Sequence, residues 1–463
     1  MENHKSEKLE VNNMMKHVLF TGLCILFIVQ VTGDYMGDWS QFGNNPQHTF
    51  FSGASVSKNL EIEWQYQFES SNKQNSDEFF CSLSSPAVVN NVVYVPTHHS
   101  MYCLDIHSGK LLQEVPAYTI YPYTPTVADG RVYLAAQPDL FRCVDTITGK
   151  TMWEKEIPDM NMVNPLIDDN TVYVTVDQLF PDTFINPCFW IASEWSTLLA
   201  IDKETGKEIW HLSLIEDPFD TGGVMRGVGF PILVDDTIFF YAQWYRSEKS
   251  YSVYSNKSGL IALDACTGAF KWICEGILPS SSMSGVNNLA PLCLTYDTGR
   301  IYIGTLSYVV CIDIETQELL WEYEDVPMWA MLSVGNGVVV VCSWTRVDCL
   351  DVETGGILWK IPIGGDSMPV MTEHEVFIGA GDENLYRVDI KTGKILESYY
   401  LGEAVYSPVI ADDHIFVTTG NNIVYCLGPS TSYFTTGILT IIAVGAGLLL
   451  LLKKGIFKRH VVE

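Results

Sequence analysis

The sequence predicts an all-β protein: an eight-bladed β-propeller of four-stranded blades, closed by an N-terminal strand and followed by one C-terminal transmembrane helix. Two observations support this fold. A ten-residue pattern, as in IDKETGKEIW, recurs seven times at intervals of 38 to 62 residues. Before each copy, two short apolar runs flank a polar turn, and an eighth such pair ends the series. Each unit therefore reads as four antiparallel strands, which is a propeller blade.

The recurring aspartate opens the turn between the third and fourth strands. Its carboxylate can accept backbone N–H groups of the turn, and the glycine that follows can adopt a positive φ. A tryptophan eight residues after the aspartate is expected to pack between neighbouring blades. The aspartates are Asp105, Asp145, Asp202, Asp264, Asp313, Asp351 and Asp389, and the tryptophans are Trp153, Trp210, Trp272, Trp321 and Trp359. Two copies carry Gln113 and Glu397 at the tryptophan position.

The eight units supply only seven outer hairpins, because Gly428 occupies the aspartate position of the last unit. The missing outer strand is expected in NLEIEWQYQF, where Trp64 takes the tryptophan position. Pairing of this strand with the last unit would leave no open sheet edge. The propeller is expected from about Trp39 to Gly428, within a domain of residues 34–432.

Both ends of the chain predict membrane-related segments. Residues 1–33 have the layout of a signal peptide, with Lys16 before an apolar run; an uncleaved anchor is the alternative, because a polar lead precedes that run. Residues 433–452 match the length of a transmembrane helix. The basic tail, residues 453–463, favours a cytosolic C-terminus. We therefore expect a single-pass type I membrane protein whose propeller is extracellular or luminal.

The charge of the body argues against nucleic acid as a partner. The net charge is −28, the first 33 residues contribute 0 and the last eleven +3, so the part between them carries −28 − 0 − 3 = −31. Such a surface repels phosphate backbones. It suits a soluble body or one that meets cations and basic partners.

The repeat resembles the pyrroloquinoline-quinone (PQQ) type of propeller repeat, through the pattern VYV followed by LDxxTGKxxW and through the lead-in WSQFGNNPQHTFFSG. That family includes quinoprotein alcohol dehydrogenases and BamB-like assembly lipoproteins, and this chain is closer in organisation to the latter. In the enzymes, the resemblance implies an axial quinone with calcium and commonly an adjacent cysteine pair. The sequence has neither a Cys-Cys dipeptide nor a Cys-x-x-Cys-His haem site, so no cofactor, metal or catalytic residue is predicted, and PQQ with calcium is the alternative.

Cysteines and paired aspartates have structural interpretations. Five cysteines share the position two residues before the aspartate slot and are expected to be small buried side chains: Cys103, Cys143, Cys311, Cys349 and Cys426. Disulfides stay open among Cys81, Cys188, Cys266, Cys274, Cys293 and Cys342. No Cys or His pair has zinc-ligand spacing. The pairs Asp168/Asp169, Asp235/Asp236 and Asp412/Asp413 favour turns over calcium sites.

Two insertions break the period, Asp177–Ser196 in unit three and Ala242–Gly259 in unit four, and the links after both units are long. All four should open on one face over blades 3–5. Additions of this kind often carry function. Their aromatic residues form the candidate binding surface: Trp190, Trp195, Tyr241, Trp244, Tyr245, Tyr251 and Tyr254. A self-packed cap is the alternative. Asn256 opens a glycosylation sequon in the second insertion.

These observations predict a membrane-anchored, non-catalytic binding module for an extracellular or luminal protein or ligand. A quinone- and calcium-dependent oxidoreductase and an assembly scaffold for a membrane complex are the alternatives.

Overall fold

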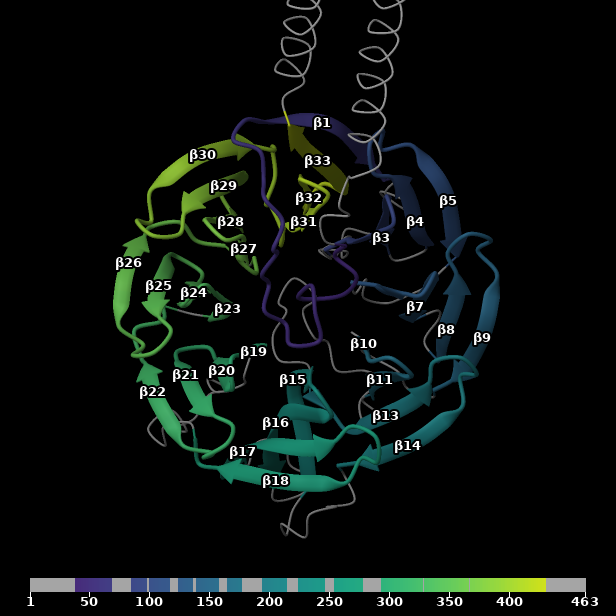
Figure 1. Ribbon diagram of the computed structural model, residues 1–463, viewed down its shortest axis with the longest axis vertical. Coiled ribbons are helices and arrows are strands. Elements are labelled where there is room, and N and C mark those ends of the chain that lie inside the picture. The colour runs from purple at the N-terminus through teal and green to yellow at the C-terminus, as the bar shows by residue number, and fades with distance from the viewer. Residues whose placement is uncertain are drawn as a thin grey trace, which may run out of the picture.

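The computed structural model describes residues 38–68, 85–97, 100–116, 124–135, 139–157, 165–176, 194–214, 224–245, 254–277, 293–327, 329–365 and 367–429. Within these ranges eight sheets form a ring (Figure 1), which confirms the eight-bladed propeller. None of the described segments is a helix with the length and apolar character needed to cross a membrane. The expected signal peptide, transmembrane helix and basic tail lie outside the described residues.

Seven blades take their four strands in sequence order from the inside outward, with β12 between two strands of blade 3 joining blade 4 instead, and the eighth blade pairs β1 with the last three strands. The first four are blade 1, β2 (Ala87–Val89), β3 (Val92–Pro96), β4 (Ser100–Asp105) and β5 (Leu111–Pro116); blade 2, β6 (Thr126–Ala128), β7 (Arg131–Ala135), β8 (Leu140–Asp145) and β9 (Thr151–Glu156); blade 3, β10 (Leu166–Ile167), β11 (Thr171–Val176), β13 (Thr197–Asp202) and β14 (Glu208–Ser213); and blade 4, β15 (Val224–Val234), β16 (Thr237–Tyr245), β17 (Tyr254–Asp264) and β18 (Phe270–Glu275), with β12 (Glu194–Trp195) as a fifth strand.

The remaining blades follow the same order: blade 5, β19 (Cys293–Asp297), β20 (Arg300–Gly304), β21 (Val309–Asp313) and β22 (Leu319–Tyr323); blade 6, β23 (Met331–Gly335), β24 (Val338–Cys342), β25 (Val347–Asp351) and β26 (Ile357–Ile361); blade 7, β27 (Val370–Met371), β28 (Glu375–Gly379), β29 (Asn384–Asp389) and β30 (Ile395–Tyr400); and blade 8, β31 (Val409–Ala411), β32 (His414–Thr419), β33 (Ile423–Pro429) and β1 (Leu60–Gln67). Antiparallel pairing places the turns between strands one and two and between strands three and four on one face, here named the turn face. The other connections reach the opposite face.

The seven aspartate turns have one geometry. Asp105 Oδ1 accepts hydrogen bonds from the N–H (2.9 Å) and the hydroxyl (2.6 Å) of Ser108, and the other six aspartates bind the threonine three residues later in the same way. These hydroxyl and backbone bonds lower the pKa of all seven carboxyl groups. The predicted role of the aspartates in the turns is confirmed.

The recurring tryptophan joins one blade to the turn of the next. Trp359 Nε1 in blade 6 donates to Ile390 O in blade 7 at 2.8 Å. Its ring covers Gly393, where an added Cβ would lie 2.7 Å from ring atoms. Four more tryptophans repeat this arrangement: Trp64 on Gly109, Trp153 on Gly206, Trp210 on Gly268, and Trp321 on Gly355. Trp272 lies near Phe239 of its own blade, and the aspartate turn of the next blade has Gln317 in place of glycine.

The two ends of the chain share blade 8, as the count of hairpins predicts. Strand β1 pairs antiparallel with β33 from Leu60 opposite Pro429 to Gln67 opposite Ile423. Trp64 is 8% exposed, and its Nε1 donates to Ile106 O of blade 1 at 2.8 Å. The N-terminal strand therefore completes one blade and binds the first turn of the next.

Residues 38–57 run across the centre of the turn face before they enter β1 (Figure 1). They hydrogen-bond to the innermost strands of six blades, at Val88, Val127, Leu233, Tyr296, Val334 and Met371. We name this stretch the crossing segment. Between its bonds to Val127 in blade 2 and Leu233 in blade 4 it passes over blade 3.

The cysteines of the shared third-strand position are buried and reduced, as predicted: Cys103, Cys143, Cys311, Cys349 and Cys426. Cys266, Cys274, Cys293 and Cys342 form no disulfide with one another or with the other described cysteines. Cys81 and Cys188 lie outside the described residues.

Candidate functional site

The two long insertions meet in an extended sheet of blade 4. The end of the first insertion forms β12, in which Glu194 lies opposite Val228 and Trp195 opposite Gly227 of β15. Much of the second insertion is not a loop but lengthens β16 and β17, which pair as far as Tyr245 opposite Tyr254. Within Ala242–Gly259, only residues 246–253 therefore fall outside the described strands.

The seven aromatic candidates are placed unequally. Tyr241 is fully buried, and its hydroxyl lies 2.6 Å from Ser258 Oγ, so the expectation that it belongs to an exposed binding surface is corrected. Burial also raises the pKa of Tyr241. Trp190 and Tyr251 lie outside the described residues. The structure describes only the backbone of the others: Trp195 in β12, Trp244 and Tyr245 in β16, Tyr254 and the sequon residue Asn256 in β17.

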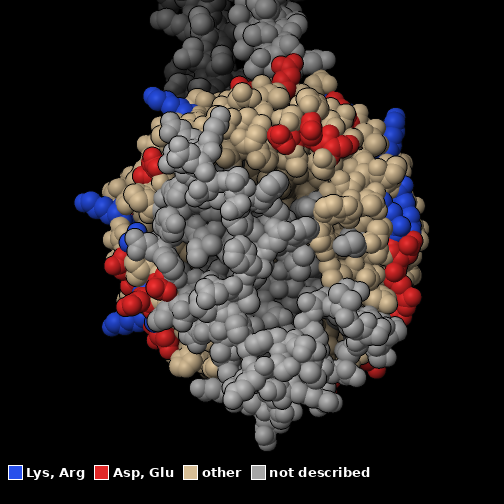
Figure 2. Space-filling view, turned by 180° about the vertical axis from the view of Figure 1, so that it is seen from behind, with Lys and Arg blue, Asp and Glu red and all other residues tan. Residues whose placement is uncertain are grey.

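A pocket of about 820 Å³ opens on the turn face, beneath the crossing segment. Its walls come from blades 2, 3 and 4 and from Ser40, Gln41, Pro46 and Gln47 of the crossing segment. The volume lies in the range of small-molecule sites. Figure 2 shows the opposite face, where the Lys, Arg, Asp and Glu side chains of the described residues lie mostly toward the edge of the molecule. The residues that line the pocket all belong to the described part of the chain.

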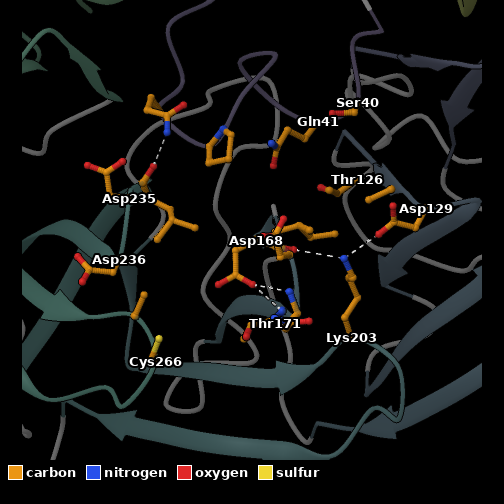
Figure 3. A pocket seen from close by; sticks show the side chains of 18 of the residues that line it. Ser40, Gln41, Thr126, Asp129, Asp168, Thr171, Lys203, Asp235, Asp236 and Cys266 are labelled. Carbon is orange, nitrogen blue, oxygen red and sulfur yellow. Dashed lines mark hydrogen bonds and ion pairs between the residues drawn. The ribbon is translucent and has the colours of Figure 1, made fainter.

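Carboxylates dominate the pocket lining. It contains Asp129, Asp168, Asp169, Asp235 and Asp236 against one cation, Lys203, so its formal charge is −5 + 1 = −4. Lys203 Nζ is itself paired with Asp129 Oδ2 at 2.7 Å, and the lysine side chain is only 6% exposed (Figure 3). The one positive charge is thus already compensated.

The aspartates also act in their turns, which agrees with the sequence interpretation. Asp168 Oδ1 accepts the N–H groups of Asn170 (2.8 Å) and Thr171 (2.7 Å). Asp235 takes a φ of 51° in the two-residue turn between β15 and β16. Turn formation and pocket lining coincide because the inner turns of neighbouring blades converge toward the axis.

Gln41 is the feature that sequence reasoning missed. The residue is 7% exposed, and its Oε1 has no hydrogen-bond partner among the described residues. Figure 3 shows its amide extending from the crossing segment into the space between Asp235 and Asp129. A buried amide oxygen without a partner costs stability. It forms an acceptor at the roof of an acidic pocket.

Aromatic side chains fill the turn-face end of the ring next to the pocket. The Phe42 ring lies 5.1 Å from the rings of Phe50 and Phe230 and 5.2 Å from His48. Burial lowers the pKa of His48 to about 3, so the imidazole is neutral at physiological pH.

His48 predicts a loss of stability in weak acid. The pKa of His48 is lowered to about 3 in the folded state, so below about pH 6.5 only the unfolded chain takes up a proton at this residue. The free energy of unfolding therefore falls as the pH is lowered from about 6.5 toward about 3. Between pH 7.5 and pH 5 this amounts to about 2 kcal/mol. Denaturant unfolding of wild type and His48→Gln at both pH values measures it: the variant should lack this part of the pH dependence. Equal pH dependence in both proteins would contradict the assignment.

The comparisons agree with this architecture. The family model described as outer membrane protein assembly factor BamB matches residues 119–361. An uncharacterised protein of Rickettsia prowazekii is 22% identical over 218 residues, which are 46% of this chain and 44% of that protein. The chain thus matches less than half the length of this curated relative.

Two solved structures show the same fold. A europium-containing methanol dehydrogenase superposes with a TM-score of 0.62 and 15% identity, covering 86% of this chain and 99% of the other. BamB from Moraxella catarrhalis superposes with a TM-score of 0.56 and 14% identity, covering 80% and 98%. At these identities the likeness shows the fold alone.

Proposed function

We propose a binding function for this chain, which belongs to the PQQ-like β-propeller family whose model bears the name of the assembly factor BamB. The partner presents a positively charged, hydrogen-bond-donating group, such as a lysine or arginine side chain, to the acidic pocket. The observation that supports this most directly is the buried Gln41 Oε1 without a partner in a pocket of formal charge −4. The proposal includes a non-catalytic role, a propeller outside the cytoplasm and a tether formed by residues 433–452.

The chemistry of the pocket favours a cation. An ammonium or guanidinium group donates to several acceptors at once. Asp236 is already paired with Lys271 Nζ at 3.2 Å, so the attraction comes from the other carboxylates, such as Asp235. Asp235 and Asp236 stand on the blade 4 side of the pocket and Asp129 on the blade 2 side (Figure 3). A charged donor between them would satisfy Gln41 as well. The body charge of −31 would steer basic partners to this surface.

Titration with the peptide Arg-Gly-Arg-Gly, against Glu-Gly-Glu-Gly, tests the pocket. We expect binding of the basic peptide only, weakening as salt rises. Gln41→Met should weaken it about tenfold, since a hydrogen bond to a charged group contributes about 1.5–3 kcal/mol. Asp235→Asn should weaken it several-fold, and Asp297→Asn, at the end of β19 beside the corresponding turn of blade 5, should leave it unchanged. Binding that none of the pocket variants alters would contradict the proposal.

The extended sheet of blade 4 supports a second surface for the same function. Three of the four additions, the two insertions and the link before β15, contribute to one sheet there. If partner capture survives Gln41→Met but is lost when residues 246–253 are replaced by a short glycine-serine turn, recognition belongs to that face and its aromatic residues.

The quinone-dependent alternative rests on the likeness to a methanol dehydrogenase. The aromatic cluster at the turn-face end of the ring, Phe42, Phe50, Phe230 and neutral His48, offers no carboxylate or amide ligand for a calcium-bound quinone. Such ligands are present in the adjacent acidic pocket. A rise in melting temperature that saturates at one equivalent of PQQ with calcium would favour this alternative over the binding module.

A further inference from the structure

Blade 8 brings together three metal-ligating side chains from its three outer strands. Glu63 of β1, His414 of β32 and Cys426 of β33 place a carboxylate oxygen, an imidazole nitrogen and a thiol within 4.8 Å of one another. We propose that these three residues form a zinc site that joins the two ends of the chain. It lies in a different blade from the acidic pocket and does not depend on the function proposed there.

The donor set fits zinc. Zinc binds thiolate sulfur, imidazole nitrogen and carboxylate oxygen, commonly with three protein ligands and a water in the fourth position. With ligand distances of about 2.0–2.3 Å, tetrahedral zinc keeps its ligands about 3.5 Å apart. His414 Nε2 and Glu63 Oε2 are already 3.3 Å apart. Only a small adjustment of the side chains is needed to bring all three to that spacing.

The outer hydrogen bond of His414 orients the imidazole for this role. Its Nδ1 is hydrogen-bonded to the carbonyl oxygen of Asp412. A carbonyl can only accept, so Nδ1 carries a proton and Nε2 is the nitrogen that faces Glu63. Metal-binding histidines usually show this arrangement. An Nε2 lone pair and a carboxylate that face each other require a proton or a metal ion between them.

The carboxylate is placed by a bulge that all blades share but that carries glutamate only in blade 8. In each blade the outermost strand has one residue without a partner in the neighbouring strand, just before the tryptophan position. This unpaired residue is Leu112 in blade 1, Leu320 in blade 5 and Leu358 in blade 6. In blade 8 the skipped residue is Glu63, between Ile62 and Trp64. Bulges redirect side chains. Here the redirected side chain reaches the start of β32.

Gly428 supplies the space. It stands where seven units have aspartate, and a Cβ there would lie 2.4 Å from His414 Cδ2 and 2.5 Å from Glu63 Cδ. The two ligands can approach each other only because this position has no side chain. Blade 8 thus departs from the repeat at Glu63, His414 and Gly428, all of them around Cys426. Four other blades have a cysteine at the same position but lack these three neighbours.

Coordination would replace the thiol proton of Cys426 by zinc and release that proton to solvent, with no change in oxidation state. Burial, and then the charge of Glu63, raises the pKa of Cys426. Zinc would offset both effects, because its charge balances the glutamate and stabilises the thiolate. Since the ligands come from both ends of the chain, bound zinc would stabilise the closed ring over any opened form.

Titration of the full-length protein with Zn²⁺ tests the proposal, with Co²⁺ as a spectroscopic probe. We expect one equivalent of Zn²⁺ to raise the melting temperature, and Co²⁺ to give a thiolate-to-cobalt charge-transfer band. Cys426→Ser should remove the band and weaken zinc binding about 100-fold or more, since even residues that only support a ligand contribute 10–100-fold. Cys349→Ser, at the same position of blade 6, should behave as wild type.

Glu63→Gln keeps the test decisive if Cys426→Ser does not fold, because Glu63 is the ligand nearest to solvent. It should weaken zinc binding and shift the cobalt spectrum. The proposal is overturned if the wild-type protein binds no zinc, if Cys426→Ser or Glu63→Gln binds it as tightly as wild type, or if bound cobalt shows no thiolate band. The last result would point to a protonated His414 paired with Glu63 and to metal held elsewhere.

Discussion

Trp64→Ala is expected to lower the free energy of unfolding by about 3–5 kcal/mol, the usual cost of removing a buried tryptophan. The loss has three sources in the structure. The ring is 8% exposed, it packs on Gly109 of the next blade, and its Nε1 donates to Ile106 O at 2.8 Å. Because β1 belongs to blade 8 and Trp64 binds it to blade 1, the substitution weakens the closure of the ring.

Denaturant unfolding of Trp64→Ala against Ile62→Ala and Trp359→Ala measures this effect. Ile62 lies in the same strand but is 46% exposed, so its substitution should cost less than about 1 kcal/mol. Trp359 makes the same contacts between blades 6 and 7, which follow each other in the chain. Trp359→Ala should therefore lower the free energy of unfolding by as much as Trp64→Ala. If Trp64→Ala costs no more than Ile62→Ala, the N-terminal strand contributes little to closure.

Gly393→Ala is expected to lower the free energy of unfolding by about 2–4 kcal/mol. The residue has a φ of 68°, which costs an alanine about 1 kcal/mol, and its Cβ would lie 2.7 Å from the Trp359 ring, which adds about 1–3 kcal/mol of overpacking. The indole is fixed by its bond to Ile390 O and has little room to withdraw.

Gly337→Ala is the matched control for Gly393→Ala. Gly337 has a φ of 78°, but nothing lies within 4 Å of its added Cβ, so only the backbone cost of about 1 kcal/mol should appear. Equal losses in the two variants would show that the contact between blades does not restrict the turn. A larger loss for Gly393→Ala would locate the difference at the tryptophan.

The periodic part of the fold could be predicted from the sequence because each blade repeats the same local physics. Asp389 and Thr392 form their turn through contacts only three residues apart, so the sequence pattern carries the structure. Closure by Trp64 followed from counting strands. Breaks in a period do not distinguish a loop from a lengthened hairpin, and at Ala242–Gly259 most of the added residues lengthen β16 and β17.

The sites were harder to predict because they combine residues from distant segments. Gln41, Asp168 and Asp235 line one pocket but belong to the crossing segment and to two different blades. In sequence, the aspartates are indistinguishable from ordinary turn formers. Glu63 and His414 are 351 residues apart, so no ligand spacing reveals them. The sequence feature that marks the proposed zinc site is Gly428 in the aspartate position of the repeat, and by itself it indicates only a degenerate unit.

Pairing of β1 with β33 is the claim on which both sites depend, since the crossing segment leads into β1 and Glu63 lies within it. Native-state hydrogen exchange of the amides from Leu60 to Gln67 tests it most directly. We expect the paired amides of β1 to exchange only through the unfolding event that also exposes the amides of β33 and β29. Exchange of β1 at the rate of an unstructured chain, while β33 stays protected, would contradict a ring closed by its own N-terminus.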